Sequence, residues 1–305
     1  MPYSPDRPLY VFFGHHKCAT GWIDDILREA CFRLGWDFRI VHRPVDFAEY
    51  GALHRLAEAE RPDFLAYTNA DRAALDGLPP FRGFHVIRDP RDVIVSGYFS
   101  HRYSHPTDGW PELAAHRAQL QQMSKEDGLL LEMAFSAERL RQMGAWDYAQ
   151  PNVLEVKMEH LTAAPHETFC AIFDFLGILD RTDRSLPVRL LKTAVMQLNA
   201  LNQRGRHRTP FGLPISPVRI PQRTLAERHV AAVLRRKSFK KLSGGRKKGQ
   251  ENVRSHYRKG QPGDWRNHFT AAHAAHFAER FGGLLERLGY EPDDRWVARH
   301  EHSTV

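Results

Sequence analysis

A lysine stands just after a short apolar run, in a segment whose residue types suit phosphate binding. Residues 9–13 (LYVFF) are typical of a β-strand, Gly14 ends it, and a helix is expected from Thr20. A loop between a strand and a helix directs free backbone N–H groups and the positive helix end at one point. Lys17 in this loop and Thr20 after it would add an ammonium group and a hydroxyl. We therefore expect the loop to bind an anion.

The common nucleotide-binding signature G-x-x-x-x-G-K-[ST] is absent from this loop, because Lys17 precedes the small residues. An ATP or GTP loop of that kind is disfavoured, whereas a variant phosphate cradle is not. Taken alone, the segment fits an ordinary loop with a lysine equally well.

Three further segments combine charged, small and aromatic residues in a specific order. They are HVIRDPRDVIVS (residues 85–96), KMEHL (157–161) and RKGQPGDWRNHFT (258–270). Together with residues 14–22 they resemble the sulfotransferases that use 3′-phosphoadenosine 5′-phosphosulfate (PAPS). The four blocks follow the order of that family. The resemblance implies sulfuryl transfer from PAPS, with 3′,5′-diphosphoadenosine (PAP) as the product, and a phosphate-binding strand–loop–helix like that of the P-loop kinases.

The resemblance gives the first block its roles. Lys17 falls on the lysine that stabilises the bridging oxygen as the sulfuryl group leaves. The rest of the 5′-phosphosulfate loop is predicted to be His16, Cys18, Ala19, Thr20, Gly21 and Trp22. The family usually has Ser-Gly-Thr-Thr after the lysine, so the sequence Cys-Ala-Thr-Gly keeps one hydroxyl. Backbone N–H groups survive these changes and still allow anion binding.

The 3′-phosphate of PAPS is bound in the family by an Arg and a Ser eight residues apart, and Arg88 and Ser96 match this pair. A guanidinium suits the task because it offers several fixed donors to oxygen. The alternative for Arg88 is an ion pair with Asp89 or Asp92. The second clamp on this phosphate is predicted at Arg258, Lys259 and Gly260.

Positive charge is concentrated near the second clamp. Residues 235–259 carry eleven Lys or Arg and one acid, so this segment has a charge of +10 in a chain whose net charge is +8. A single basic segment suits a compact, highly charged ligand better than a long nucleic-acid backbone. The alternative is a solvated basic loop. Within the segment, Phe239 is placed to stack on the adenine of PAPS or, equally well, to pack on the core.

The general base is not evident from the sequence. Many relatives use a His in a Thr-His-Leu-Pro stretch, but the corresponding residue here is Asn69, which cannot take a proton at neutral pH. Other branches use an acid on the helix after the phosphate loop, and Asp25, eight residues after Lys17, is our first candidate. Its alternative is a solvated acid favoured by the helix dipole. His15 and His16 are the other candidates.

Strands and helices alternate along the chain, which predicts an α/β fold with a central parallel sheet flanked by helices. We expect a single sulfotransferase domain over residues 1–305, with helical insertions at about 105–150 and 181–236. Strands are predicted at residues 9–13, 38–41, 63–67, 84–87 and 152–156. Helices are predicted at residues 20–34, 47–60, 111–149, 160–176, 225–236 and 270–288, and loops at 204–222 and 238–264.

Composition narrows the remaining possibilities. Three cysteines in 305 residues argue against a disulfide framework and predict a reducing, cytoplasmic location. No apolar run is long enough for a membrane span. We expect no metal cofactor and no nucleic-acid partner, and an acceptor that is a small molecule or a glycan with a hydroxyl or, less favoured, an amine. The oligomeric state is left open. The alternatives are a kinase with a variant phosphate loop, which would need ATP and Mg²⁺, and a polyanion-binding protein.

Overall fold

The computed structural model describes residues 3–182, 185–208 and 219–303. Their contacts form two compact units that interleave along the chain. The first unit comprises Met1–Gly14, Ala19–Val86 and Tyr148–Ser238, and the second comprises His15–Cys18, Ile87–Asp147 and Phe239–Val305. The loop predicted to bind phosphate thus belongs to the second unit up to Cys18. A single domain over the whole chain stays a prediction.

The first unit is built on a five-stranded sheet in the order β2-β3-β1-β4-β5. Its strands are β1 (Leu9–Gly14), β2 (Phe38–Val41), β3 (Phe64–Tyr67), β4 (Phe81–Ile87) and β5 (Val153–Lys157). The pairs β1–β3, β1–β4 and β2–β3 are parallel. The α/β fold with a central parallel sheet is therefore confirmed.

The central strand β1 shows why this sheet forms. Leu9, Val11, Phe12 and Phe13 are all fully buried, as expected for a strand with neighbours on both edges and cover on both faces. The ring of Phe12 stacks on that of Phe84 in β4, with centroids 4.9 Å apart. The connection that leaves β1 leads to β2 on one side of β1, whereas the connection that leaves β3 leads to β4 on the other side. In parallel sheets, ligands bind beyond the carboxyl ends of the strands at the point where the chain changes direction in this way. Gly14 marks that end.

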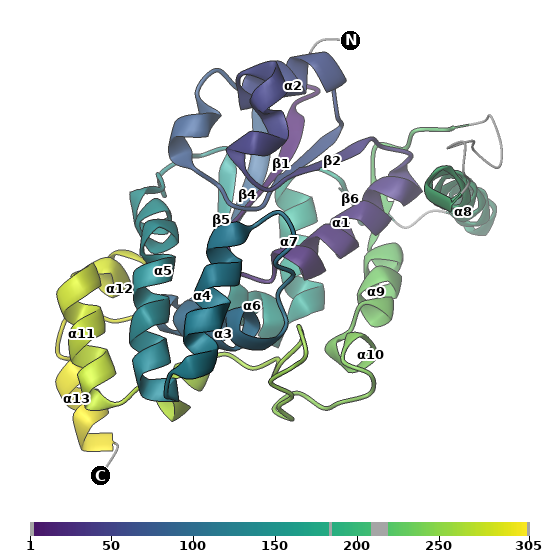
Figure 1. Cartoon of the computed structure of the whole chain (residues 1–305). Coiled ribbons are helices and arrows are strands. Elements are labelled where there is room, and N and C mark those ends of the chain that lie inside the picture. The colour runs from purple at the N-terminus through teal and green to yellow at the C-terminus, as the bar shows by residue number, and fades with distance from the viewer. Residues whose placement is uncertain (1–2, 183–184, 209–218, 304–305) are drawn as a thin grey trace. The chain divides into compact units, whose positions relative to one another are not determined.

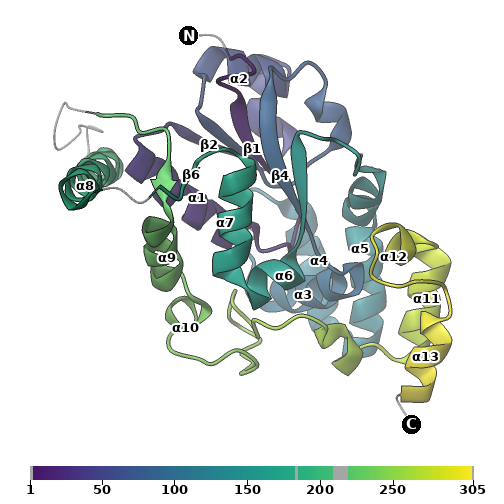
Figure 2. The same ribbon diagram turned by 180° about the vertical axis from the view of Figure 1, so that it is seen from behind.

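Helices surround the sheet of the first unit. α1 (Thr20–Leu34) packs against α8 (Leu186–Arg208) and α9 (Glu227–Arg236), and α7 (Pro165–Phe175) lies across the strands beside α9 when seen from behind (Figure 2). The shorter elements are the 3₁₀-helices η1 (Pro44–Tyr50) and η2 (Arg72–Leu75), the helices α2 (Leu53–Glu60) and α6 (Met158–Ala163), and the strands β6 (Leu179–Asp180) and β7 (Leu225–Ala226).

The second unit is helical. α3 (Pro90–Tyr103) packs against α4 (Pro111–Gln122) and α5 (Lys125–Ala145), and α5 packs in turn against α11 (Ala271–Phe281), as Figure 1 shows. The remaining elements are α10 (Phe239–Leu242), η3 (Asp264–Asn267), α12 (Leu284–Arg287) and α13 (Trp296–Ser303). No helix among the described residues is long and apolar enough to span a membrane.

The structure corrects several predicted boundaries. The helix expected at 47–60 is split at Gly51, whose φ of 75° suits glycine. The helix expected at 160–176 breaks before Pro165, which cannot continue a helix that precedes it. The helix expected at 270–288 breaks at Gly282 and Gly283. Residues 204–208 are helical rather than loop, 209–218 lie outside the described residues, and the loop expected at 238–264 contains α10.

Candidate active site

The loop after β1 has a strained backbone. Lys17 has a φ of 65° and Ala19 a φ of 60°, both in the left-handed region that favours glycine. Each such residue costs on the order of 1 kcal/mol, and such strain is concentrated at functional sites. Ala19 falls where the sulfotransferases usually have Gly. Cys18 between them is fully buried, and its backbone N–H donates to the His15 carbonyl at 3.1 Å.

Arg88 links this loop to the start of α3. Its Nη1 donates to the backbone carbonyl of Lys17 at 3.1 Å, within the second unit. The residue is 7% exposed, and its Nε has no hydrogen-bond partner among the described residues. The predicted ion pair with Asp92 is long, at 3.9 Å. A buried guanidinium with an unused donor normally requires a partner, so Arg88 is suited to an anionic ligand.

Asp92 instead holds the last sequence block. Its carboxylate accepts hydrogen bonds from the backbone N–H groups of Gly263 and Trp265, at 2.6 and 2.9 Å. α3 therefore carries Ser96, a residue of the predicted first 3′-phosphate clamp, and its Asp92 holds the segment after the predicted second clamp. Ser96, the predicted partner of Arg88, lies half-buried on the same helix.

The cations of the second clamp are held by one buried carboxylate. Asp264 accepts from Arg258 at 2.5 Å and also from Lys259, and Glu251 is a second partner of Arg258. Burial alone would raise the pKa of Asp264, but hydrogen bonds from His268, Lys259 and Asn267 and the charge of Arg258 hold it well below its usual range. Asp264 thus fixes both cations at the end of the basic segment.

Gly260 and Phe239 lie in direct contact. Gly260 has a φ of 68°, and a Cβ atom there would lie 2.5 Å from Phe239 Cε2. Only glycine therefore lets the ring sit against this backbone. The Arg246 guanidinium lies 5.7 Å from the centroid of the same ring. The structure brings these two predicted site residues together across 21 residues of sequence.

The electrostatics of the second unit favour an anion beside Lys17. The pKa of the Lys17 ammonium is lowered to about 8, by burial first and then by the positive charges of Arg88 and Arg258, while Glu132 acts in the opposite direction. Because the guanidinium groups of Arg88 and Arg258 lower the pKa of Lys17, these three cations lie close together. A bound anion would relieve this repulsion.

The remaining predicted site residues lie in the first unit, on α1. Ala19 is its N-cap, and Thr20 and Gly21 begin the helix. The indole Nε1 of Trp22 donates to the carbonyl of Lys237 at 2.8 Å. The Asp25 carboxylate forms ion pairs with Lys237 at 2.9 Å and with Arg28 at 3.2 Å. Asp25 as the general base stays a prediction.

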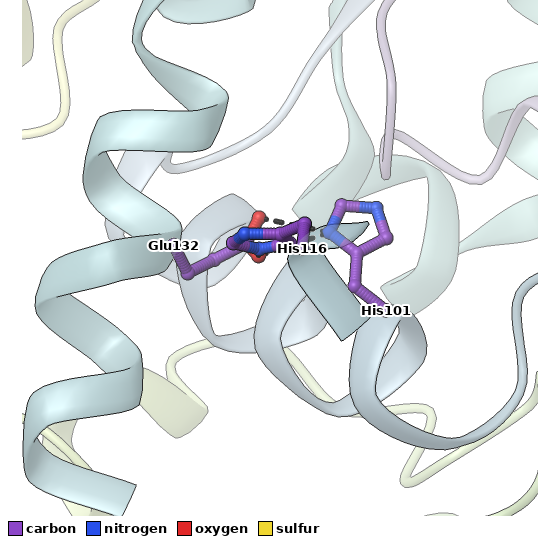
Figure 3. Close-up of side chains that lie close together, drawn as sticks. All are labelled: His101, His116 and Glu132. Atoms are coloured by element: carbon purple, nitrogen blue, oxygen red, sulfur yellow. Dashed lines mark hydrogen bonds and ion pairs between the residues drawn. The ribbon is translucent and has the colours of Figure 1, made fainter. Parts of the chain in front are cut away.

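The sequence reasoning missed a buried histidine–glutamate network in the second unit (Figure 3). His101 on α3 and His116 on α4 both donate to Glu132 on α5, at 2.9 and 2.8 Å. His101 and Glu132 are fully buried. The other ring nitrogen of His101, Nε2, lies 2.9 Å from His16 Nε2. No sequence periodicity relates positions 101 and 132, so this network can be recognised only from the packing of the helices.

Comparison with known proteins agrees with the family named from the sequence. Residues 213–289 match the family model described as sulfotransferase domain, which covers Phe239 and the second clamp. This match confirms the sulfotransferase resemblance. No curated protein matches the chain by sequence.

The solved structures similar to most of this chain include the following three. Mouse sulfotransferase SULT7A1 complexed with PAP is 16% identical, with a TM-score of 0.47 over 99% of this chain and 91% of that one. Retinol dehydratase with androsterone and the inactive cofactor PAP is 15% identical, with a TM-score of 0.44 over 94% and 82%. Retinol dehydratase with retinol and PAP is 16% identical, with a TM-score of 0.44 over 92% and 82%. Likeness at this level carries no argument about function.

Proposed function

We propose that this chain transfers the sulfuryl group of PAPS to a hydroxyl of a small-molecule or glycan acceptor, in the cytoplasm. The observation that carries the proposal is the junction of Lys17 and Arg88, where a buried guanidinium donates to the lysine carbonyl and its Nε has no hydrogen-bond partner in the described part of the chain. The matched sulfotransferase segment supplies the second pair of cations, Arg258 and Lys259. Cys18, Cys31 and Cys170 are all buried, and so small a number of cysteines suits a reducing compartment.

The predicted site residues have different roles in an in-line displacement at sulfur. The acceptor oxygen forms a bond to sulfur while the bond from sulfur to the bridging oxygen breaks, and the leaving group is PAP. Lys17 and backbone N–H groups of the loop around it stabilise the charge that develops on the bridging oxygen. Arg88, Ser96, Arg258, Lys259 and Gly260 bind the 3′-phosphate, and Phe239 lies beside the adenine. Fixing the nucleotide at both phosphates orients sulfur for attack.

Calorimetric titration with PAP and with ATP tests the proposal. Wild-type protein should bind PAP and prefer it to ATP, because the 3′-phosphate meets the two clamps. Arg88→Ala should weaken PAP binding by roughly 10- to 100-fold, since hydrogen bonds to a charged group contribute about 1.5–3 kcal/mol. Arg141→Ala is the matched control, because Arg141 lies on the same unit but is exposed and pairs only with Glu138 among the described residues.

Two results would contradict the proposal. If PAP does not bind, the phosphate clamps have been misassigned. If ATP with Mg²⁺ binds better than PAP, the protein is a kinase with a variant loop.

A further inference from the structure

A chain of three hydrogen-bonded side chains runs from the phosphate loop into the core of the second unit. His16 next to Lys17 is half-buried, and its Nε2 lies 2.9 Å from Nε2 of His101. Nδ1 of His101 lies 2.9 Å from Oε2 of Glu132. His101 and Glu132 are fully buried, so only the His16 end reaches the surface. We propose that His16, His101 and Glu132 form a proton relay that accepts the proton of the acceptor hydroxyl.

The hydrogen bonds fix where the ring protons lie. Burial raises the pKa of the Glu132 carboxyl, but the charge of His101 and hydrogen bonds from His101, His116 and Ser136 lower it to about 2. Glu132 is therefore ionised and only accepts, so His101 carries its hydrogen on Nδ1. Nε2 of a neutral His101 then has a lone pair, and the hydrogen between the rings lies on His16 Nε2. This leaves His16 Nδ1 free to take a proton.

The surroundings keep both rings neutral before the reaction. Burial, Lys17 and Arg139 lower the pKa of both His16 and His101, while Glu132 raises that of His101. The groups that face the two rings are Lys17 in the loop, His105 after α3, His116 on α4, and Glu132 and Arg139 on α5. A neutral imidazole is the form that a general base requires.

The proton moves in two steps while the sulfuryl group is transferred. The acceptor O–H gives its proton to His16 Nδ1, and its electron pair forms the new bond to sulfur. The proton on His16 Nε2 passes to His101 Nε2, which makes His101 an imidazolium ion beside the Glu132 carboxylate. A proton kept on His16 would lie next to the Lys17 ammonium. The relay moves that charge to a carboxylate and leaves Lys17 to act on the leaving oxygen.

Packing holds the relay in place. A Cβ atom on Gly97 would overlap Glu132 Oε1, so glycine on α3 makes room for the carboxylate. His101 has edge contacts with the rings of Trp110 and Phe135. A buried carboxylate with three donors can also be purely structural, and the test must separate that role from proton transfer.

The first measurement is ¹⁵N–¹H NMR of the imidazole rings in the PAP-bound protein, which does not depend on the acceptor. We expect the hydrogen of His101 on Nδ1 and that of His16 on Nε2. A hydrogen on His16 Nδ1 would overturn the relay, because no acceptor atom would then face the hydroxyl.

The second measurement is single-turnover transfer from PAPS to phenol and to the much more acidic 4-nitrophenol. His101→Gln and Glu132→Gln should lower the rate with phenol by about 10²-fold, the usual scale of general-base catalysis, and the rate with 4-nitrophenol far less. PAP affinity should not change. His273→Gln, a buried histidine of the same unit that bonds to Thr270 and the Glu126 carbonyl, should keep wild-type rates, and thermal melts check that each variant folds.

The relay rests on the proposed function, but different results would refute the relay and the proposed function. Loss of PAP binding by the wild type would refute the sulfotransferase proposal. Normal PAP binding with an undiminished rate in His101→Gln would refute only the relay. Equal losses with both phenols would show a structural role. A large phenol-specific loss in Asp25→Asn with none in Glu132→Gln would place the base on Asp25.

Discussion

The charge of Lys17 should limit turnover at alkaline pH. Its pKa is lowered from 10.5 to about 8, by burial first and then by Arg88 and Arg258. An amine is protonated below its pKa, so the ammonium that stabilises the leaving oxygen is lost as pH rises through about 8. One pH unit above the pKa, roughly a tenth of the molecules keep the charge, whereas an ordinary lysine would stay almost fully charged. We therefore expect kcat/KM at pH 9 to be about tenfold below its plateau.

The assay is steady-state sulfuryl transfer from PAPS between pH 6 and 10, with Lys17→Arg measured beside the wild type. kcat/KM reports the pKa values of the free enzyme, and the arginine keeps its charge throughout this range. Dividing wild-type by variant values removes the ionisation of the acceptor, which is common to both. The ratio should fall above pH 8. A ratio that stays flat to pH 9.5 would refute the lowered pKa of Lys17. Lys17→Ala should reduce turnover far more than PAP affinity.

Two glycine-related substitutions test the backbone and packing arguments by urea unfolding. Ala19→Gly should raise the free energy of unfolding by about 1 kcal/mol, because the left-handed φ of 60° is strained for alanine; a destabilised variant would contradict the strain. Gly97→Ala should lower the free energy of unfolding by roughly 1–3 kcal/mol, since the new methyl overlaps Glu132 Oε1. Gly21→Ala is its control, because a Cβ there would meet no described atom within 4 Å apart from its chain neighbours and its own helix backbone, and similar losses in both variants would refute the packing argument.

The local features of this protein could be predicted from its sequence. β1 is a run of apolar residues buried on both faces, and α1 has its hydrophobic spacing and a glycine at its end, so short-range patterns determine both. Short-range patterns also place Lys17 in the loop after a strand and identify the Arg-Lys-Gly block at residues 258–260. These signals are local because each depends on backbone geometry within a few residues.

Contacts between distant residues were decided only by the tertiary structure. Asp89 or Asp92 was the alternative partner of Arg88, but Asp92 accepts its short hydrogen bonds from the backbone of Gly263 and Trp265. These two donors lie 171 and 173 residues away from Asp92 along the chain, so no local pattern could relate them.

The histidine network shows the physical reason most clearly. Glu132 on α5 would be expected to face solvent, because burying a lone carboxylate is costly. The structure buries it because His101, His116 and Ser136 supply donors from three helices and Gly97 leaves the space. The sequence by itself predicted the five strands of the central sheet and the resemblance to the sulfotransferases. Tertiary packing alone decided which buried charges meet, because their free energy depends on partners that no local pattern specifies.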